Sequence, residues 1–288
     1  MISRASALLL CVAVEFANCA WAQVQPQAAD GILERFALSA ETSQQWKLPD
    51  KLNEISGLAS TADARLLAVT DESAIVYELD YAEGRLIKAF ALGEPTVSGD
   101  FEGIAYFDGQ VWLVTSEGVI YESAEGEDGE RVAFDRYPTG LGKFCEIEGL
   151  AYRQSDNVLL ALCKKIKKKS NLASLTIFAW STTSYKVIDE KTIALPDREI
   201  AAALRNDRLN PSGIAIDPVS GNLLVVASRP QAVIELDPGG GFMSARVLPL
   251  ATRHRQAEGI EILATGDLLI ADEGGAHKAR LALYRPGD

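Results

Sequence analysis

The chain has 288 residues, of which 48% are hydrophobic, and its formal net charge at pH 7 is −12. This length and apolar share allow a sizeable core in one large all-β domain or in two small domains. The acidic balance makes nucleic acid and anionic membranes poor partners, because like charges repel, but it is compatible with cations.

The first 22 residues have the features of an export signal. Arg4 precedes an apolar run over residues 7–14, and Ala20-Trp21-Ala22 fits the small-x-small cleavage rule. We therefore expect a signal peptide over residues 1–22 and a mature chain that begins at Gln23. The mature protein is expected to be periplasmic or secreted, and association with the envelope is the alternative.

Two other fates of the N-terminus are alternatives. An uncleaved membrane anchor would need a longer apolar run to span a bilayer. Lipidation at Cys19 would make the protein envelope-associated, but the preceding Phe16-Ala17-Asn18 is a poor match to a lipoprotein signal.

One segment recurs five times along the remaining chain. The five copies, which share a glycine followed by an apolar residue, are Glu54-Ile-Ser-Gly-Leu-Ala-Ser60, Asp100-Phe-Glu-Gly-Ile-Ala-Tyr106, Glu146-Ile-Glu-Gly-Leu-Ala-Tyr152, Asn210-Pro-Ser-Gly-Ile-Ala-Ile216 and Gln256-Ala-Glu-Gly-Ile-Glu-Ile262. Their glycines (Gly57, Gly103, Gly149, Gly213 and Gly259) are spaced by 46, 46, 64 and 46 residues. A fixed period of this length indicates a repeat architecture.

Each copy is followed by a turn and then by a continuous apolar run, such as Val111-Trp-Leu-Val-Thr115 or Leu223-Leu-Val-Val-Ala227. Runs of that length between turn residues are typical of strands that are buried on both faces. A third, more alternating strand and a weaker fourth follow. Four strands in 40 to 50 residues is about the size of a propeller blade.

The two ends of the chain predict how the ring closes. The last repeat has only three strands before the chain stops. Leu48, at the end of residues 43–48, lies nine residues before Gly57, just as Leu250 lies nine residues before Gly259. We expect this segment to complete the last blade and so remove two open edges. The prediction is a single five-bladed β-propeller over residues 43–288, with a lead-in over residues 23–42. Six blades are the alternative, if residues 32–38 and the long third repeat hide another.

The long third repeat contains the 18 extra residues. They include a lysine run over residues 164–169 and a stretch, residues 197–207, that could form a short helix. The lysine run is either a docking patch for an anionic partner or, as is commoner, a solvated loop.

The residue before each repeat glycine is either serine or glutamate, namely Ser56, Glu102, Glu148, Ser212 and Glu258. Equivalent positions in a propeller meet around its axis, so three carboxylates would converge there. Their charge must be offset by protonation, by a basic residue or by a cation. A hard cation with oxygen ligands fits these residue types, so we predict a Ca²⁺ site at Glu102, Glu148 and Glu258.

A second set of charged residues follows the second strand of each repeat. It comprises Asp71, Glu72, Glu117, Asp272 and Glu273, with Lys164 and Arg229 at the equivalent places in the other two repeats. These acids either extend the metal site or bond to turns and neighbouring blades, and the two basic residues could pair with the axial glutamates.

Catalytic and cofactor motifs are missing from the sequence. His254 and His277 are the only histidines, both in polar surroundings, and there is no nucleophile elbow, metalloprotease motif or phosphate-binding glycine pattern. We therefore predict no catalytic and no cofactor-binding residues. Cys145 and Cys163 lie across a predicted hairpin, about three residues out of register, and form either a disulfide or two separate buried thiols.

The repeats Asp100-Phe-Glu-Gly-Ile-Ala-Tyr106 and Glu146-Ile-Glu-Gly-Leu-Ala-Tyr152, with Ile55-Ser-Gly-Leu58 and Ala68-Val-Thr-Asp-Glu72, resemble the SdiA-regulated (YjiK-like) family of bacterial envelope proteins over about residues 45–286. The resemblance implies a five-bladed propeller, a bound calcium at Glu102, Glu148 and Glu258, and no established enzymatic activity. This chain departs from the family at Cys163-Lys164, where a small residue followed by Lys and Glu is expected.

Two functions follow as hypotheses. The first is an exported, calcium-binding propeller that acts as a binding or scaffolding module for an unknown small molecule or envelope protein. The second is a metal-dependent hydrolase of a lactone or phosphate ester, in which an axial ion with an open position polarises the substrate. The sequence favours the first, because the Asn- and Asp-rich ligand pattern expected of such lactonases is missing.

Overall fold

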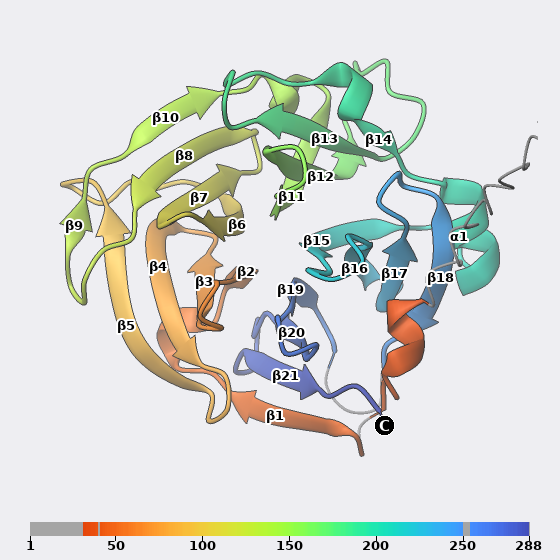
Figure 1. The fold of residues 1–288 in the computed structure, drawn as a ribbon, viewed down its shortest axis with the longest axis horizontal. Coiled ribbons are helices and arrows are strands. Elements are labelled where there is room, and N and C mark those ends of the chain that lie inside the picture. Colours follow the sequence, from red (N-terminus) through yellow and green to blue (C-terminus); the bar gives the residue numbers. More distant parts are fainter. Residues whose placement is uncertain (1–30, 40, 250–253, 288) are drawn as a thin grey trace, which may run out of the picture.

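The structure of this protein is a computed structural model, and it describes residues 31–39, 41–249 and 254–287. Five sheets of mainly antiparallel strands stand around a central axis, and in each the strand that carries the repeat glycine is innermost (Figure 1). The chain is therefore a five-bladed β-propeller, as the repeat spacing predicts. The predicted signal peptide and the first part of the lead-in lie outside the described residues.

The strands of each blade follow the chain from the axis outward. Blade 1 consists of β2 (Ile55–Ser60), β3 (Leu66–Thr70), β4 (Ser73–Asp80) and β5 (Arg85–Leu92), with a short parallel strand at its edge, β9 (Arg131–Val132). Blade 2 consists of β6 (Phe101–Phe107), β7 (Gln110–Thr115), β8 (Val119–Ala124) and β10 (Asp135–Pro138). Blade 3 consists of β11 (Cys145–Arg153), β12 (Val158–Ile166), β13 (Thr176–Ser181) and β14 (Ile193–Ala194). Blade 4 consists of β15 (Asn210–Ile216), β16 (Leu223–Arg229), β17 (Ala232–Leu236) and β18 (Phe242–Val247).

Blade 5 joins the two ends of the chain. Its inner strands are β19 (Ala257–Ile262), β20 (Leu268–Asp272) and β21 (Arg280–Tyr284), and its outer strand is β1 (Ser43–Lys47). Strand β1 pairs antiparallel with β21, from Ser43 opposite Tyr284 to Lys47 opposite Arg280. The predicted closure by residues 43–48 is thus confirmed, and it leaves neither of these two edges unpaired within the ring.

The hydrophobic core is divided into five clusters, and each lies between two neighbouring blades. Strand β12 shows why the second strands are apolar throughout. Leu159 and Ala161 pack toward blade 2, whereas Leu160 and Leu162 pack toward blade 4. Successive side chains of a strand point to opposite faces, so a strand with a blade on either side needs apolar residues at every position.

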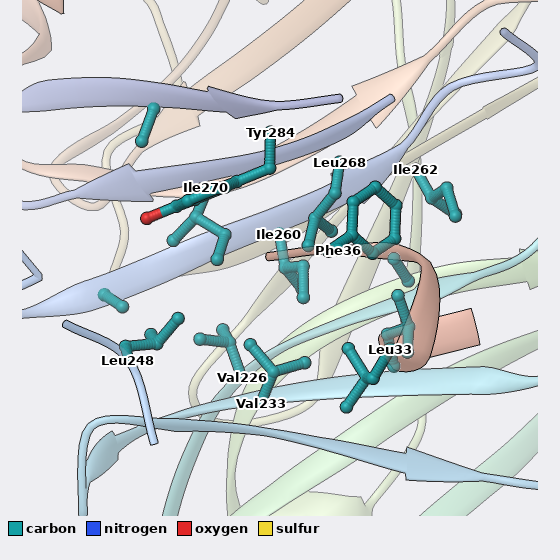
Figure 2. Close-up of a cluster of buried hydrophobic side chains, with 14 of the residues drawn as sticks. Leu33, Phe36, Val226, Val233, Leu248, Ile260, Ile262, Leu268, Ile270 and Tyr284 are labelled. Carbon is teal, nitrogen blue, oxygen red and sulfur yellow. The ribbon is translucent and has the colours of Figure 1, made fainter. Parts of the chain in front are cut away.

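Part of the predicted lead-in belongs to the folded ring. A 3₁₀ helix, η1 (Ile32–Arg35), lies against blades 4 and 5, where Leu33 and Phe36 are buried among residues such as Val233 and Ile262 (Figure 2). The backbone N–H groups of Ile32 and Leu33 donate to the carboxylate of Glu235, at 2.7 and 3.1 Å. Because this segment is a helix on the outside of the ring, it contributes no sixth blade.

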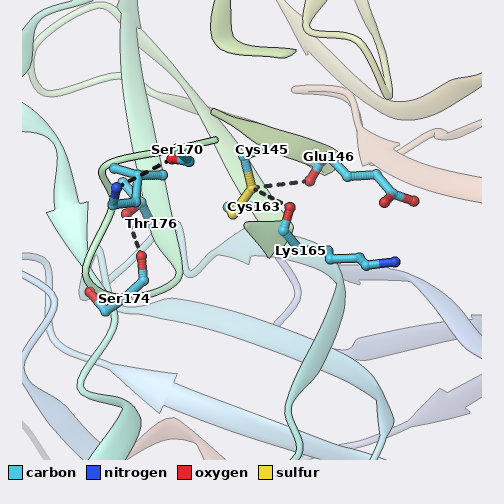
Figure 3. Close-up of a disulfide and its surroundings, with 8 residues drawn as sticks. Cys145, Glu146, Cys163, Lys165, Ser170, Ser174 and Thr176 are labelled. Atoms are coloured by element: carbon cyan, nitrogen blue, oxygen red, sulfur yellow. Dashed lines mark hydrogen bonds between the residues drawn. A yellow bond between two sulfur atoms is a disulfide. The ribbon is translucent and has the colours of Figure 1, made fainter. Parts of the chain in front are cut away.

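The long third repeat contains most of the remaining helical structure. It includes the predicted short helix, α1 (Asp197–Leu204), and a 3₁₀ turn, η4 (Asp189–Lys191); the other 3₁₀ turns are η2 (Asp50–Leu52) and η3 (Leu141–Lys143). The disulfide alternative also holds in this repeat, since Cys145 of β11 and Cys163 of β12 are bonded, with their Cα atoms 5.7 Å apart (Figure 3).

Candidate functional site: a charged axial channel and a wide funnel

The residue before each repeat glycine occupies an irregularity of the β ladder. In every blade the register between the first and second strands shifts at this residue, for instance between Phe101 and Gly103 and between Ala257 and Gly259. A bulge of this kind redirects a side chain out of the regular alternation. Ser56 uses it to donate to the carbonyl of Phe101 at 2.7 Å, and Ser212 to that of Ala257 at 2.6 Å, so each serine bonds to the next blade.

The repeat glycines are required by close packing at the axis. A Cβ on Gly103 would lie 2.5 Å from the backbone nitrogen of Leu150, and one on Gly213 would meet the carbonyl oxygen of Glu258. The glycines of blades 1 to 4 thus lie against the backbone of the next blade, and Gly259 of blade 5 lies against the side chain of Leu58 in blade 1. The space between the glycines is a cavity of only about 10 Å³, which is room for one water molecule at most.

The three predicted glutamates meet a lysine of blade 3. The Nζ atom of Lys164 lies 2.8 Å from Oε2 of Glu148, whose side chain is only 3% exposed. Lys164 also interacts electrostatically with Glu102 and Glu258. The structure therefore brings all three acids together around one ammonium group. Of the two basic residues that the sequence offered as partners, Lys164 is the one that meets them.

The electrostatics of this cluster follow from burial. Burial raises the pKa of Glu102, and repulsion by Glu148 and Asp100 adds to it. Burial likewise raises the pKa of Glu258 to about 8, against the opposing effect of Lys164. Burial lowers the pKa of Lys164, but attraction by Glu148 outweighs it, so the net shift is upward. The ammonium thus stays charged while the acids hold protons more firmly than usual.

In this structure the cation beside the three glutamates is the ammonium of Lys164. Among the residues that the structure describes, no group of three or more His, Cys, Asp or Glu side chains is arranged to hold a metal. A Ca²⁺ site at Glu102, Glu148 and Glu258 stays a prediction, and it requires Lys164 to move away.

The rim residues have different roles. The carboxylate of Asp272 bonds to Nδ1 of His254 at 2.7 Å, and Glu117 pairs with Lys167 at 2.9 Å. Burial, with repulsion by Glu54 and Glu273, raises the pKa of Asp71 to about 6. Arg229 is exposed and forms no ion pair with any residue in the described ranges.

His254 lies in a loop with polar partners, as expected, but it is buried, which the sequence analysis did not anticipate. It is 1% exposed, and its Nε2 lies 2.6 Å from the hydroxyl of Tyr284, opposite Asp272. Its partners come from β20 and β21, which are distant in sequence, so local composition could not show this buried chain of polar groups.

At the other end of the inner strands the axis widens into a funnel of about 950 Å³. All five blades line it, through the ends of their first strands and the turns that follow. Ile104 and Leu150 line both this funnel and the narrow channel, so the two spaces share the axis. On one side the rings of Phe107 and Tyr152 stack 3.6 Å apart.

Glu261 is a funnel residue that the sequence analysis missed. Its position in the repeat is alanine in the other four blades, namely Ala59, Ala105, Ala151 and Ala215. Its carboxylate accepts hydrogen bonds from the backbone N–H groups of Ser60 at 3.1 Å and Ile262 at 2.9 Å. Burial raises its pKa to about 7. A glutamate at a position where the other four repeats have alanine is the sequence signal that could have identified this residue.

Solved structures share this fold at low identity. The glutaminyl cyclase of Myxococcus xanthus matches with a TM-score of 0.58 and 10% identity, over 85% of this chain and 96% of that protein. A luciferin-regenerating enzyme matches with a TM-score of 0.52 and 11% identity, over 84% of this chain and 95% of that protein. At such identities the likeness shows the propeller fold alone. Among the curated proteins, no sequence matches this chain.

None of the helices in the described ranges is long and apolar enough to cross a membrane. The model of the SdiA-regulated family matches residues 37–275, and the chain therefore belongs to the SdiA-regulated family.

Proposed function

We propose that this protein is a binding module that takes a small-molecule ligand in the funnel rather than in the glutamate channel. The observation that supports this most directly is the difference between the two ends of the axis. The channel holds about 10 Å³ and its carboxylates face Lys164, whereas the funnel holds about 950 Å³. Ligand pockets of proteins usually measure roughly 300–1,000 Å³.

The funnel also has the composition of a binding site. Apolar and aromatic side chains form much of its wall, with Tyr106, Phe107 and Tyr152 on blades 2 and 3. Polar side chains from all five blades complete the lining, among them Thr61, Asp217 and Glu261. Aromatic surface with a few polar groups is the usual make-up of sites that orient a ligand.

The setting of this module is proposed to be outside the cytoplasm, in the cell envelope. The disulfide between Cys145 and Cys163 supports this, because such bonds persist mainly in oxidising compartments. The predicted signal peptide points to the same place.

The alternative of a metal-dependent hydrolase has less support. It needs an ion with an open position beside a space for substrate, and the cavity between the repeat glycines is too small for both.

Chemical-shift mapping tests the proposal. The mature protein, labelled on its backbone amides, would be titrated with a set of small neutral, anionic and cationic compounds at millimolar concentration. We expect the perturbed amides to lie in residues 59–62, 104–108, 150–155 and 215–221. Perturbations centred on residues 54–57, 100–103 and 146–149, at the glutamate end, or none for any compound, would refute it.

A further inference from the structure

Glu261 breaks the five-fold pattern of the funnel at a position where the other blades have a buried alanine. Those alanines are between 1% and 8% exposed, so the position has room for little more than a methyl group in each of them. In blade 5 the longer carboxylate reaches the first blade, where it accepts a hydrogen bond from Ser60. Placing a carboxylate in a largely buried position costs free energy.

No cation within the described part of the chain compensates this carboxylate. Its bonded partners there are neutral groups, namely the backbone N–H groups of Ser60 and Ile262 and the side chain of Ser60, and no ion pair within the described ranges includes it. Two N–H groups orient an acid but supply no full positive charge. A carboxylate that lines a funnel of this size is therefore accessible to a positive group brought in by a ligand.

Among the described residues, the rest of the lining carries no free positive charge either. Its one basic residue, Arg153, donates to both oxygens of Asp156 at 2.9 Å, so its guanidinium is already paired. Asp108 adds an exposed acid to the same wall, and the carboxylate of Asp217 is held by Ser220. Anionic ligands would thus meet uncompensated acids in the funnel and no free cation.

The aromatic side chains of the funnel favour a ligand of a particular shape. Phe107 stacks between Tyr152 at 3.6 Å and Trp112 at 5.5 Å, so it supports the ring of Tyr152 as a rigid surface between blades 2 and 3. Such a surface favours a flat or apolar ligand body, and the faces of aromatic rings also attract organic cations.

We propose that the funnel binds an organic cation, an ammonium or guanidinium group on an apolar or aromatic body, with Glu261 as the counter-ion and the Phe107–Tyr152 pair as the stacking surface. This inference rests on the proposed function, because it names the ligand class of the same funnel. It assigns Glu261 a role beyond the bond that joins blade 5 to blade 1.

Three probes with one aromatic body separate charge from shape: phenethylamine, 2-phenylethanol and phenylacetate. Their dissociation constants would be measured by amide shift titration on the mature protein at pH 8. We expect phenethylamine to bind at least ten-fold more tightly than the alcohol, and phenylacetate to bind most weakly.

Two variants test the residue. Glu261→Gln keeps the size of the side chain, and Glu261→Ala introduces the residue of the other four blades. Both should remove the preference for the amine over the alcohol while the alcohol still binds. Asp207→Asn, which removes one exposed acid elsewhere, is the control for net charge and should leave the preference unchanged.

The outcomes distinguish the two proposals. Equal binding of amine and alcohol at the funnel, or a preference that survives both Glu261 variants, overturns the organic-cation inference and leaves the funnel as a binding site. If none of the probes, nor any compound of the wider set, perturbs funnel amides, both proposals fall. Because the stability of each variant is measured alongside, loss of the fold cannot be mistaken for loss of binding.

Discussion

The ammonium of Lys164 lies 2.8 Å from the carboxylate of Glu148, at the point where three acids of a five-fold ring converge. Glu148 is 2% exposed as a residue and Lys164 about one quarter exposed as a side chain, so the pair bridges the buried channel and its mouth. Lys164 thus pairs with one of the three glutamates for which the sequence predicts a calcium ion, as the sequence analysis offered as an alternative.

Replacing Lys164 should reveal which cation the channel prefers. We expect millimolar Ca²⁺ to leave the melting temperature of the wild-type protein unchanged, and to raise that of Lys164→Met, in which three carboxylates remain without an ammonium. Without calcium, the variant should lose roughly 2 kcal/mol of unfolding free energy, because Glu148 is left unpaired. Calorimetry and thermal unfolding measure both effects.

Lys165→Met is the matched control, since Lys165 is the exposed neighbour. A wild-type protein that calcium stabilises, with this effect lost in a Glu102→Gln/Glu148→Gln double variant, would instead establish the predicted metal site.

The disulfide should stabilise blade 3. It closes a segment with a sequence separation of 18, for which loop entropy predicts roughly 3 kcal/mol. We expect Cys145→Ser/Cys163→Ser to lose about that amount in urea unfolding, and the wild-type protein to lose the same amount when a reductant is added. The double variant should not respond to reductant. Equal stability of all these forms would show that the bond contributes nothing to folding.

Glu261 should make stability depend on pH. Because its pKa is about 7 in the folded protein and 4.5 is the reference value, the folded state binds the proton more tightly than the unfolded chain. Relative to Glu261→Ala, the wild-type protein should therefore lose roughly 1–3 kcal/mol as pH rises from about 4.5 to 7, with little further change above that. Urea unfolding of both proteins over this pH range measures the difference. A wild-type protein that gains stability relative to Glu261→Ala as pH rises would contradict the raised pKa.

The repeat glycines should tolerate no side chain. Gly103→Ala would place a methyl group 2.5 Å from the backbone of Leu150, and we expect it to cost about 3 kcal/mol or more through overpacking. Gly109→Ala is the comparison. Gly109 has open space around it, so the only cost of a methyl group there is the backbone strain of a positive φ, which is 75°. It should cost about 1 kcal/mol. Similar melting temperatures for the two variants would show that contact at the axis is not what requires glycine.

The sequence determined the fold because each blade repeats the same local demands. In every blade the repeat glycine must pack closely at the axis, and the second strand, such as Val158–Leu162, must be apolar because it is buried on both faces. The spacing of 46 residues matches one blade. The last repeat lacked a strand and residues 43–48 supplied it, so ring closure could also be predicted. The family followed from the same motifs.

The site depended on contacts that no local pattern contains. The sequence placed Glu102, Glu148 and Glu258 at the axis and offered both Lys164 and Arg229 as partners, but only the paired strands β11 and β12 decided that Lys164 meets Glu148. His254 met Asp272 and Tyr284 because three distant segments pack together in blade 5. The funnel exists because five strand ends surround one axis, and Glu261 gains its surroundings from the first blade. Repetition along the chain therefore fixed the architecture, whereas charge pairing and cavity shape arose only when the ring assembled, because they depend on distances between blades.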